Sequence, residues 1–209
     1  MYLPTPYKIR DAQELRWRIR AHPFGTLITV GAAGLSANAI PWIIDGPGLG
    51  VLRGHVARAN PVWRDHDARI ESLVVFNGPD SYITPTWYAT TRETGKVVPT
   101  WNYVTVQARG RLLIHDDAGW VRRNVEELTH FHEATRQAPW SVSDAPPDFI
   151  DGLLKAIVGV EIELTSLVGK KKASQGRPAA DVAGVIEGLR DAGAPFVTEM
   201  TDGNEASGR

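Results

Sequence analysis

The sequence predicts an α+β protein in which a small antiparallel β-barrel carries peripheral helices. In the first half of the chain, short β-rich stretches alternate with Gly- and Pro-containing turns of hairpin length. In the second half, apolar residues recur at helical spacing in three stretches around one alternating strand. About six or seven strands are expected, which is enough to curl into a small barrel.

The first elements expected are a helix and a meander of strands. Asp11 can cap a helix over Ala12–His22, with Glu14 three residues further on, and Pro23 ends this helix. Gly-rich turns then separate three strands, expected over Phe24–Val30, Leu35–Ile44 and Leu49–Val56. Loops this short place consecutive strands side by side, in antiparallel order.

The centre of the chain continues the β pattern after a short helix. Asn60 can cap that helix, with Pro61 in its first turn. Three extended stretches follow, over Arg69–Asn77, Ser81–Pro85 and Val97–Ile114. Gly78–Asp80 is expected to form a turn between the first two, and Gly110 is expected to mark a bulge or bend in the third.

The second half is expected to contain the peripheral helices. They are predicted over Ala118–Ala134, Phe149–Ile157 and Asp181–Ala192, with Asp144 as a candidate N-cap before the second. Val158–Leu167 alternates cleanly and predicts a strand with one buried face. We expect one domain over residues 1–197 and a flexible tail over 198–209, because the last residues are small, polar or charged.

Composition limits the classes of function. The 209 residues carry 23 Lys and Arg against 24 Asp and Glu, a net charge of −1, which disfavours DNA binding without excluding it. The absence of cysteine excludes disulfides, thiolate metal sites and a cysteine nucleophile. No stretch approaches the apolar length of a membrane span, and the start has no signal-peptide pattern. A cytoplasmic protein that does not contact membranes is expected.

The region Gly54–Tyr103 interrupts the apolar strand pattern with cations, amides and aromatic rings. Rings can stack on a planar ligand, amides can read its edge, and cations can hold a phosphate. Candidate contacts come from this region and from a later loop: His55, Arg58, Asn60, Tyr82, Thr84, Trp87, Tyr88, Lys96, Thr100, Trp101, Asn102, Tyr103, Ser174 and Gln175. Among them, Arg58, Lys96 and Ser174 are the expected phosphate contacts.

Structural explanations compete with several of these assignments. The stretch SYITPTWY also suits a barrel wall, and Lys170–Lys172 is either an exposed strand end or loop, or a phosphate or subunit contact. A metal site is not expected, since His130 and His132 are two residues apart on a helix and point to different faces. The glycine pattern of dinucleotide-binding folds is absent. The residues alone therefore support a site for a planar anion and no named reaction.

Six longer stretches carry a family resemblance: MYLPTPY, GHVARANPVW, VVFNGPDSYITPTWY, TGKVVPTWNYVTV, APWSVSDAPPDFIDGLLKAIVGVEIEL and GKKKASQGRP. In this order they span nearly the whole chain, which resembles the PaiB-type FMN-binding negative transcriptional regulators. The resemblance implies a split β-barrel related to pyridoxamine-phosphate oxidase-like flavoproteins. It also implies a homodimer with FMN at the subunit interface. The chain departs from the family pattern at Lys171 and Gly176, where Trp and Asn are usual, and by Phe131 and His132, inserted in a helix.

Two functions follow from this resemblance. The first is a regulator whose flavin occupancy or redox state sets its contacts with a partner, with DNA as one candidate. The alternative is a flavin-dependent oxidoreductase of the pyridoxamine-phosphate oxidase-like class, in which the protein orients the substrate and the flavin carries electrons. A plain ligand-binding protein is the third possibility. The resemblance assigns no catalytic residue.

Overall fold

The computed structural model describes residues 1–201, which divide into two compact units. Unit 1 comprises Met1–Asp11, Asn77–Val106 and the chain from Val168 onwards. Unit 2 comprises Ala12–Phe76 and Gln107–Leu167. A single domain over 1–197 stays a prediction. No helix within residues 1–201 is both long and apolar enough to cross a membrane.

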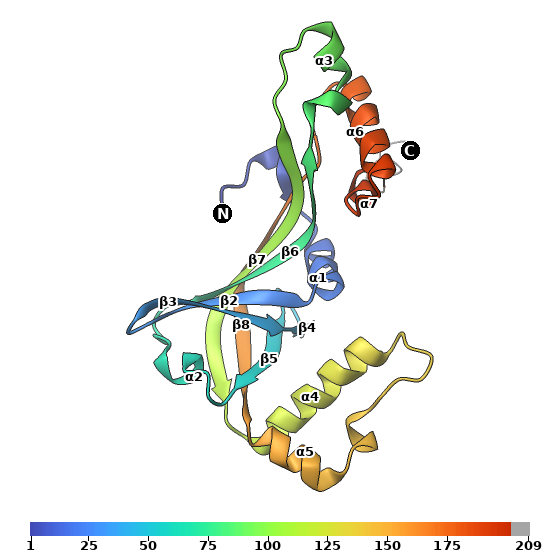
Figure 1. The fold of residues 1–209 in the computed structure, drawn as a ribbon. Coiled ribbons are helices and arrows are strands. Elements are labelled where there is room, and N and C mark those ends of the chain that lie inside the picture. Colours follow the sequence, from blue (N-terminus) through green and yellow to red (C-terminus); the bar gives the residue numbers. More distant parts are fainter. Residues whose placement is uncertain (202–209) are drawn as a thin grey trace. The chain divides into compact units, whose positions relative to one another are not determined.

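Eight strands form one sheet, in the order β3-β2-β6-β7-β8-β5-β4, with β1 paired to β8 (Figure 1). The strands are β1 Lys8–Ile9, β2 Phe24–Gly31, β3 Gly34–Pro41, β4 Ile43–Asp45, β5 Val51–Ala57, β6 Ser72–Ile83, β7 Thr100–His115 and β8 Ile157–Lys172. The count exceeds the expected six or seven because the short strands β1 and β4 were not anticipated.

Seven α-helices accompany the sheet in the described part of the chain. They are α1 Ala12–Ala21, α2 Val62–Asp65, α3 Ala89–Glu93, α4 Ala118–Glu133, α5 Pro147–Leu154, α6 Ala179–Asp191 and α7 Val197–Thr201. Short 3₁₀ turns are η1 Thr5–Tyr7, η2 Pro85–Trp87 and η3 Val142–Asp144. The helix α7 occupies the first residues of the predicted tail, and residues 202–209 lie outside the described residues.

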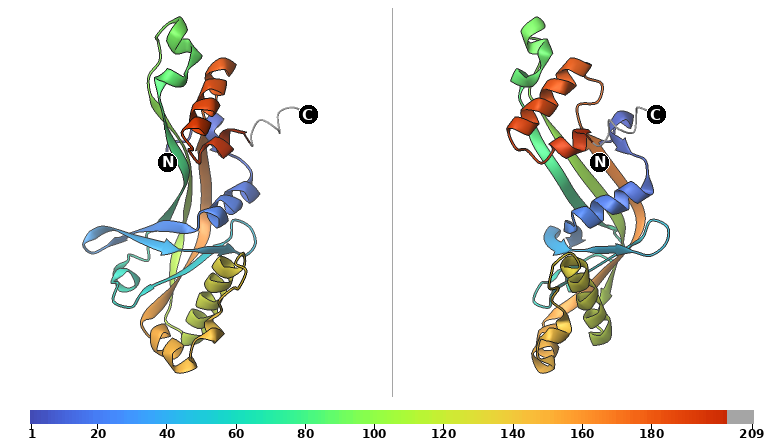
Figure 2. Two further views of the ribbon diagram at one scale, coloured as in Figure 1. Left: turned by 45° about the vertical axis from the view of Figure 1, so that its right-hand side comes forward. Right: turned by 90° about the vertical axis from the view of Figure 1, so that its right-hand side faces the viewer.

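Unit 2 is built around apolar side chains from the alternating positions of its strands. Leu27, Leu52, Val74 and Ile162 are fully buried, each one on a different strand. The helix α4 packs against β5 and α5, and Figure 2 shows α4 and α5 side by side. The side chain of Asp117 accepts a hydrogen bond from the Trp120 amide at 2.7 Å and so caps α4.

Unit 1 contains part of each long strand, β6, β7 and β8, together with α3, α6 and α7. Trp87 packs against α6, where a methyl group added at Gly184 or Gly188 would overlap its backbone or indole atoms. Asp181, in the first turn of α6, accepts hydrogen bonds from the amide and hydroxyl of Thr90 at 2.9 and 3.0 Å. These contacts join α6 to the segment between β6 and β7 (Figure 2).

The turn predicted at Gly78–Asp80 is wrong, because β6 continues through it. The glycine serves close approach to another strand: a Cβ at Gly78 would lie 3.1 Å from that of Val104. Gly110 lies within β7, where a Cβ would overlap the carbonyl of Glu163, so the absence of a side chain again permits close backbones.

Other boundaries differ by a few residues. The strand predicted over Leu35–Ile44 is divided at Trp42, whose side chain is buried and whose amide donates to Pro23 at 2.9 Å. Asp144 does not cap α5: its carboxylate accepts from the Ser141 amide at 2.8 Å within η3. The strand β8 then begins at Ile157 and runs to Lys172, beyond the predicted end at Leu167.

Candidate functional site

Strand alternation gathers rings and lysines on one face of the three long strands, β6, β7 and β8, in unit 1. Trp101 and Tyr103 are two residues apart on β7, as are Lys170 and Lys172 on β8, so each pair shares a face. Tyr82 of β6 contacts the ring of Trp101. We call these five residues the aromatic–lysine face.

The rings of this face are accessible to a ligand. Tyr82 and Trp101 meet edge to face, with centroids 5.9 Å apart and planes at 68°. They remain 47% and 54% exposed, so much of each ring is left for further contacts. The ammonium of Lys170 lies 5.3 Å from the centre of the Tyr103 ring, a favourable cation–π distance.

Lys172 brings a second cation close to Trp101. Its Nζ donates to the Trp101 carbonyl at 2.7 Å and also to the hydroxyl of Thr100. Burial lowers the pKa of the Lys172 ammonium, and the positive charges of Lys170 and Arg177 lower it further, whereas Tyr103 raises it. Within residues 1–201 neither Lys170 nor Lys172 forms an ion pair, whereas Arg177 pairs with Asp181 at 4.0 Å. A bound anion would supply an opposite charge to the two lysines.

An open pocket of about 430 Å³ lies beside these rings. It is lined by Asn77, Gly78, Asp80, Trp101, Tyr103 and Val104. Asn77 and Asp80 provide polar groups, and the two aromatic side chains provide apolar surface. Such a combination suits a flat ring that carries hydrogen-bonding groups on its edge.

The opposite face of β7 holds Asn102, which is fully buried. Its Nδ2 donates to the Ser174 hydroxyl at 2.9 Å. Gln175 binds its own loop, accepting from the Ala173 amide and donating to the Lys171 carbonyl, both at 2.7 Å. The predicted contacts are therefore divided between two faces: Trp101 and Tyr103 lie on one, and Asn102 and its partner Ser174 on the other.

Four more predicted residues of unit 1 lie between β6 and β7. Thr84 caps η2 by accepting from the Thr86 amide, and Trp87 packs on α6. Tyr88 is fully buried beneath the guanidinium of Arg177, 4.2 Å from its ring centre, and burial raises the pKa of its phenol. Lys96 is exposed.

The remaining three predicted residues lie in unit 2, at and after the end of β5. Burial lowers the pKa of His55, which favours the neutral imidazole. The Asn60 carboxamide oxygen accepts from the Val62 amide at 3.0 Å, as expected for the start of α2. The Arg58 guanidinium binds both Asp116 oxygens, at 2.5 and 3.1 Å.

Arg58 also donates to two backbone carbonyls, those of Lys155 at 2.7 Å and Ile157 at 3.2 Å. The pKa of the guanidinium is raised, chiefly through the hydrogen bond to Asp116. A pocket of about 440 Å³ lies beside this group, at the start of α4. A phosphate bound by Arg58 would compete with Asp116 for the same donors.

Comparison with known proteins decides which family these residues represent. A family model described as "Putative FMN-binding domain" matches residues 1–166. The chain belongs to this family. It is 32% identical to the protease synthase and sporulation protein PAI 2 of Bacillus subtilis, over 97% of this chain and 95% of that protein. It is 35% identical to an uncharacterised protein of Emericella nidulans, over 92% of each.

Solved structures support the fold of this FMN-binding-domain chain. It is similar to a FAD and haem binding protein of Mycobacterium smegmatis, with a TM-score of 0.60 and 15% identity. The match covers 85% of this chain and 79% of that one. The predicted α+β split β-barrel is confirmed, as is the PaiB-type resemblance.

Two members of the aromatic–lysine face, Lys170 and Lys172, are not among the fourteen candidate contacts; the sequence leaves Lys170–Lys172 open as an exposed strand end or loop, or as a phosphate or subunit contact. The alternation of Val158–Leu167 continues through Val168 to Lys172, which places alternate lysines on alternate faces of β8. Continuing the strand would have identified them. Lys171 instead pairs with Glu199 at 3.2 Å.

Proposed function

We propose that this protein binds FMN on the aromatic–lysine face. The observation that carries the proposal is the exposed pair of rings, Tyr82 and Trp101, beside the two cations Lys170 and Lys172, in a member of an FMN-binding family. Exposed rings can stack on the isoalloxazine, and ammonium groups bind phosphate. The residues present therefore fit the two chemical parts of this cofactor.

The proposal assigns roles to side chains of this face. Tyr82, Trp101 and Tyr103 would contact the isoalloxazine, and Lys172 would bind the phosphate with help from Lys170. Bound flavin would supply electron transfer in units of one or two electrons. The other predicted contacts stay predictions: His55, Arg58, Asn60, Thr84, Trp87, Tyr88, Lys96, Thr100, Asn102, Ser174 and Gln175.

A homodimer belongs to the same proposal. Tyr2, Val98 and Trp101 of unit 1 are large apolar side chains that are 83%, 67% and 54% exposed. Aromatic residues are enriched at interfaces between chains. A second copy of the chain would cover this surface and enclose the flavin. The proposal also places the dimer in the cytoplasm.

Titration with FMN tests the cofactor. We expect absorption bands of flavin to stay with the protein on gel filtration, and riboflavin, which lacks the phosphate, to bind more weakly. Trp101→Ala and Lys172→Gln should each weaken FMN binding, whereas only Trp101→Ala should weaken riboflavin binding. Trp17→Ala is the matched control, because Trp17 in unit 2 is also 54% exposed. Retention of full FMN affinity by both site variants would overturn the proposal.

The regulatory role rests on the PaiB-type family. In this proposal, flavin occupancy sets the contacts of the protein with a partner, with DNA as one candidate. Binding to DNA through phosphates would weaken steeply with salt, since counterions are released. A gel-shift titration at two salt concentrations, with and without FMN, tests this. No shift under either condition would exclude direct DNA binding.

A flavin-dependent oxidoreductase is the second candidate. The observation that favours it is the open pocket beside Trp101 and Tyr103, which offers room for a planar substrate. Rapid mixing of the FMN-loaded protein with NADH or NADPH should then bleach the flavin absorption. Absence of bleaching with both donors would exclude a nicotinamide-dependent enzyme.

A further inference from the structure

The face of β7 opposite to the aromatic–lysine face holds a polar group that the proposed FMN site does not use. Asn102 is fully buried there, and its Nδ2 lies 2.9 Å from the Ser174 hydroxyl and 3.7 Å from the sulfur of Met200. Its carboxamide oxygen is buried and has no hydrogen-bond partner within residues 1–201. Buried amide oxygens are nearly always paired, so this one requires an explanation.

The partner of Asn102 has an unusual backbone. Ser174 has a φ of 61°, and it is the one non-glycine residue of the described chain in the left-handed region. Gln175 holds this loop in place through its bonds to Ala173 and Lys171. Backbone strain of this kind persists where surrounding contacts enforce it, and it is concentrated at binding sites.

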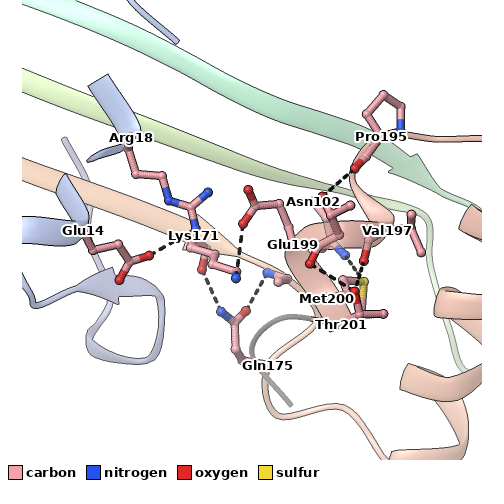
Figure 3. Close-up of polar contacts among 12 residues, drawn as sticks. Glu14, Arg18, Asn102, Lys171, Gln175, Pro195, Val197, Glu199, Met200 and Thr201 are labelled. Atoms are coloured by element: carbon pink, nitrogen blue, oxygen red, sulfur yellow. Dashed lines mark hydrogen bonds and ion pairs between the residues drawn. The ribbon is translucent and has the colours of Figure 1, made fainter. Parts of the chain in front are cut away.

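The short helix α7 covers this group (Figure 3). Its Met200 is 7% exposed and places a thioether, a weak acceptor, against the Asn102 amide. Glu199 binds Lys171 at 3.2 Å and fastens the helix to β8. The helix α7 has only five residues, and an element this short can open locally without unfolding of the sheet beneath it.

We propose that Asn102 and Ser174 form a second binding site, covered by α7, for a ring that carries a lactam or imide edge. The Asn102 carboxamide presents an acceptor beside a donor, and a lactam edge presents a donor beside an acceptor, so the two pair through two hydrogen bonds. The unpaired Asn102 oxygen would then gain its partner. A ligand binds this site only when α7 has moved. Its apparent affinity is therefore its intrinsic affinity multiplied by the fraction of molecules in which the site is open.

Thiol reactivity measures the movement of α7, because the chain has no cysteine of its own. In a Met200→Cys protein, the single thiol lies on the buried side of α7 and reacts with dithionitrobenzoate only when the helix opens. Adding Lys171→Gln removes the ion pair with Glu199, and we expect about a tenfold faster reaction as the open fraction rises. Lys8→Gln removes the same charge from an exposed position of unit 1 and should leave the rate unchanged.

Riboflavin, whose ring has an imide edge and which lacks a phosphate, is the probe for the covered site. The comparison is made in a Trp101→Ala background, which weakens riboflavin binding on the aromatic–lysine face. With Met200 in place, Lys171→Gln should then tighten riboflavin binding, measured by its fluorescence, by the factor found for the thiol. The further change Asn102→Leu should remove this gain. An unchanged thiol rate would show that α7 is not a movable cover. If the thiol reacts faster but riboflavin does not bind more tightly, the site does not bind this edge. The same conclusion follows if the increase in riboflavin affinity persists in Asn102→Leu.

This test is separated from the proposed FMN site because every variant in the riboflavin comparison carries the same Trp101→Ala change on the aromatic–lysine face. The comparison therefore measures only the effects of Lys171→Gln and Asn102→Leu. Failure of the full chain to retain FMN would overturn the proposed function and leave the thiol and riboflavin comparison intact. Conversely, FMN could bind as proposed while α7 stays closed, which would overturn only the covered site.

Discussion

Lys172 is the residue whose charge state should be most visible in ligand binding. Its pKa is lowered by burial and by neighbouring cations, so it loses its proton at a lower pH than an ordinary lysine. The phosphate of FMN is already a dianion above its second pKa of about 6. We expect FMN affinity to be highest while Lys172 is protonated and to fall as pH rises through its lowered pKa, which fluorescence titrations from neutral to alkaline pH would measure.

Two controls identify Lys172 as the origin of that pH dependence. Lys172→Arg keeps the charge at all these pH values, so its FMN affinity should stay level where that of the natural protein declines. Riboflavin has no phosphate, and its affinity should not follow the decline. The same alkaline decline in Lys172→Arg would show that another group titrates.

Arg58 was predicted to bind phosphate, and its contacts in the structure connect parts of unit 2. The guanidinium joins the end of β5 to Asp116 and to the carbonyls of Lys155 and Ile157. We expect Arg58→Ala to lower the melting temperature, since these three groups lose a common donor.

The hydrogen bond from Arg58 holds the pKa of Asp116 below its usual value. The ion pair should therefore stabilise the fold fully above the ordinary pKa of aspartate, and this contribution should vanish as pH falls through the lowered one.

Comparing Arg58→Ala with Asp116→Ala separates the two roles of this arginine. If Arg58 only stabilises unit 2, both variants lower the melting temperature near neutral pH and both keep their FMN affinity. A loss of FMN affinity confined to Arg58→Ala would instead support the phosphate contact predicted from the sequence.

At the level of elements, replacing glycine by alanine should have opposite effects on stability at two positions in helices. Gly188 in α6 lies against the indole of Trp87, with no room for a methyl group. Gly188→Ala should cost about 1–3 kcal/mol, as overpacked cores do. A methyl group added at Gly152 in α5 would meet nothing within 4 Å beyond its chain neighbours and the backbone of its own helix. Gly152→Ala should therefore stabilise the helix by up to about 1 kcal/mol through its higher helix propensity.

Urea unfolding of the two glycine variants measures both free energies under the same conditions. The pair controls for the helix propensity of alanine, which is the same gain in each helix. If Gly188→Ala were as stable as Gly152→Ala, Trp87 would not be anchored on α6 as the structure shows.

Elements with local signals were predictable, and elements that depend on distant partners were not. The amphipathic spacing of α4 and α6 gave their bounds to within about two residues, because a helix closes its hydrogen bonds within its own segment. The continuation of β6 through Pro79 depends instead on the neighbouring strands. Glycine and proline there indicate a turn when only the local sequence is considered.

The sequence identified residues of the candidate site but did not show which of them share a surface. The sequence identified Trp101, Asn102 and Tyr103, and strand alternation alone separates Asn102 from its two neighbours. It did not show that α7 covers Asn102, because that contact joins residues 98 positions apart. Nor did it show that Asp116 binds Arg58, since pairing of exposed charges is set by the fold and not by their spacing in the chain.

At the scale of the whole molecule, the exposed rings predict self-association. Trp101→Glu places a charge at the proposed interface, where burying it would require removing its water. We expect the natural protein to sediment as a dimer and Trp101→Glu to shift towards the monomer. FMN affinity should also fall, because the variant loses a proposed flavin contact and, in the proposed dimer, the second chain that encloses each cofactor site. Trp140→Glu changes another exposed tryptophan, in unit 2, and should remain a dimer. If the natural protein is a monomer and still retains FMN, one chain completes the site. If the Trp101→Glu and Trp140→Glu dimers dissociate equally, the interface is not at Trp101.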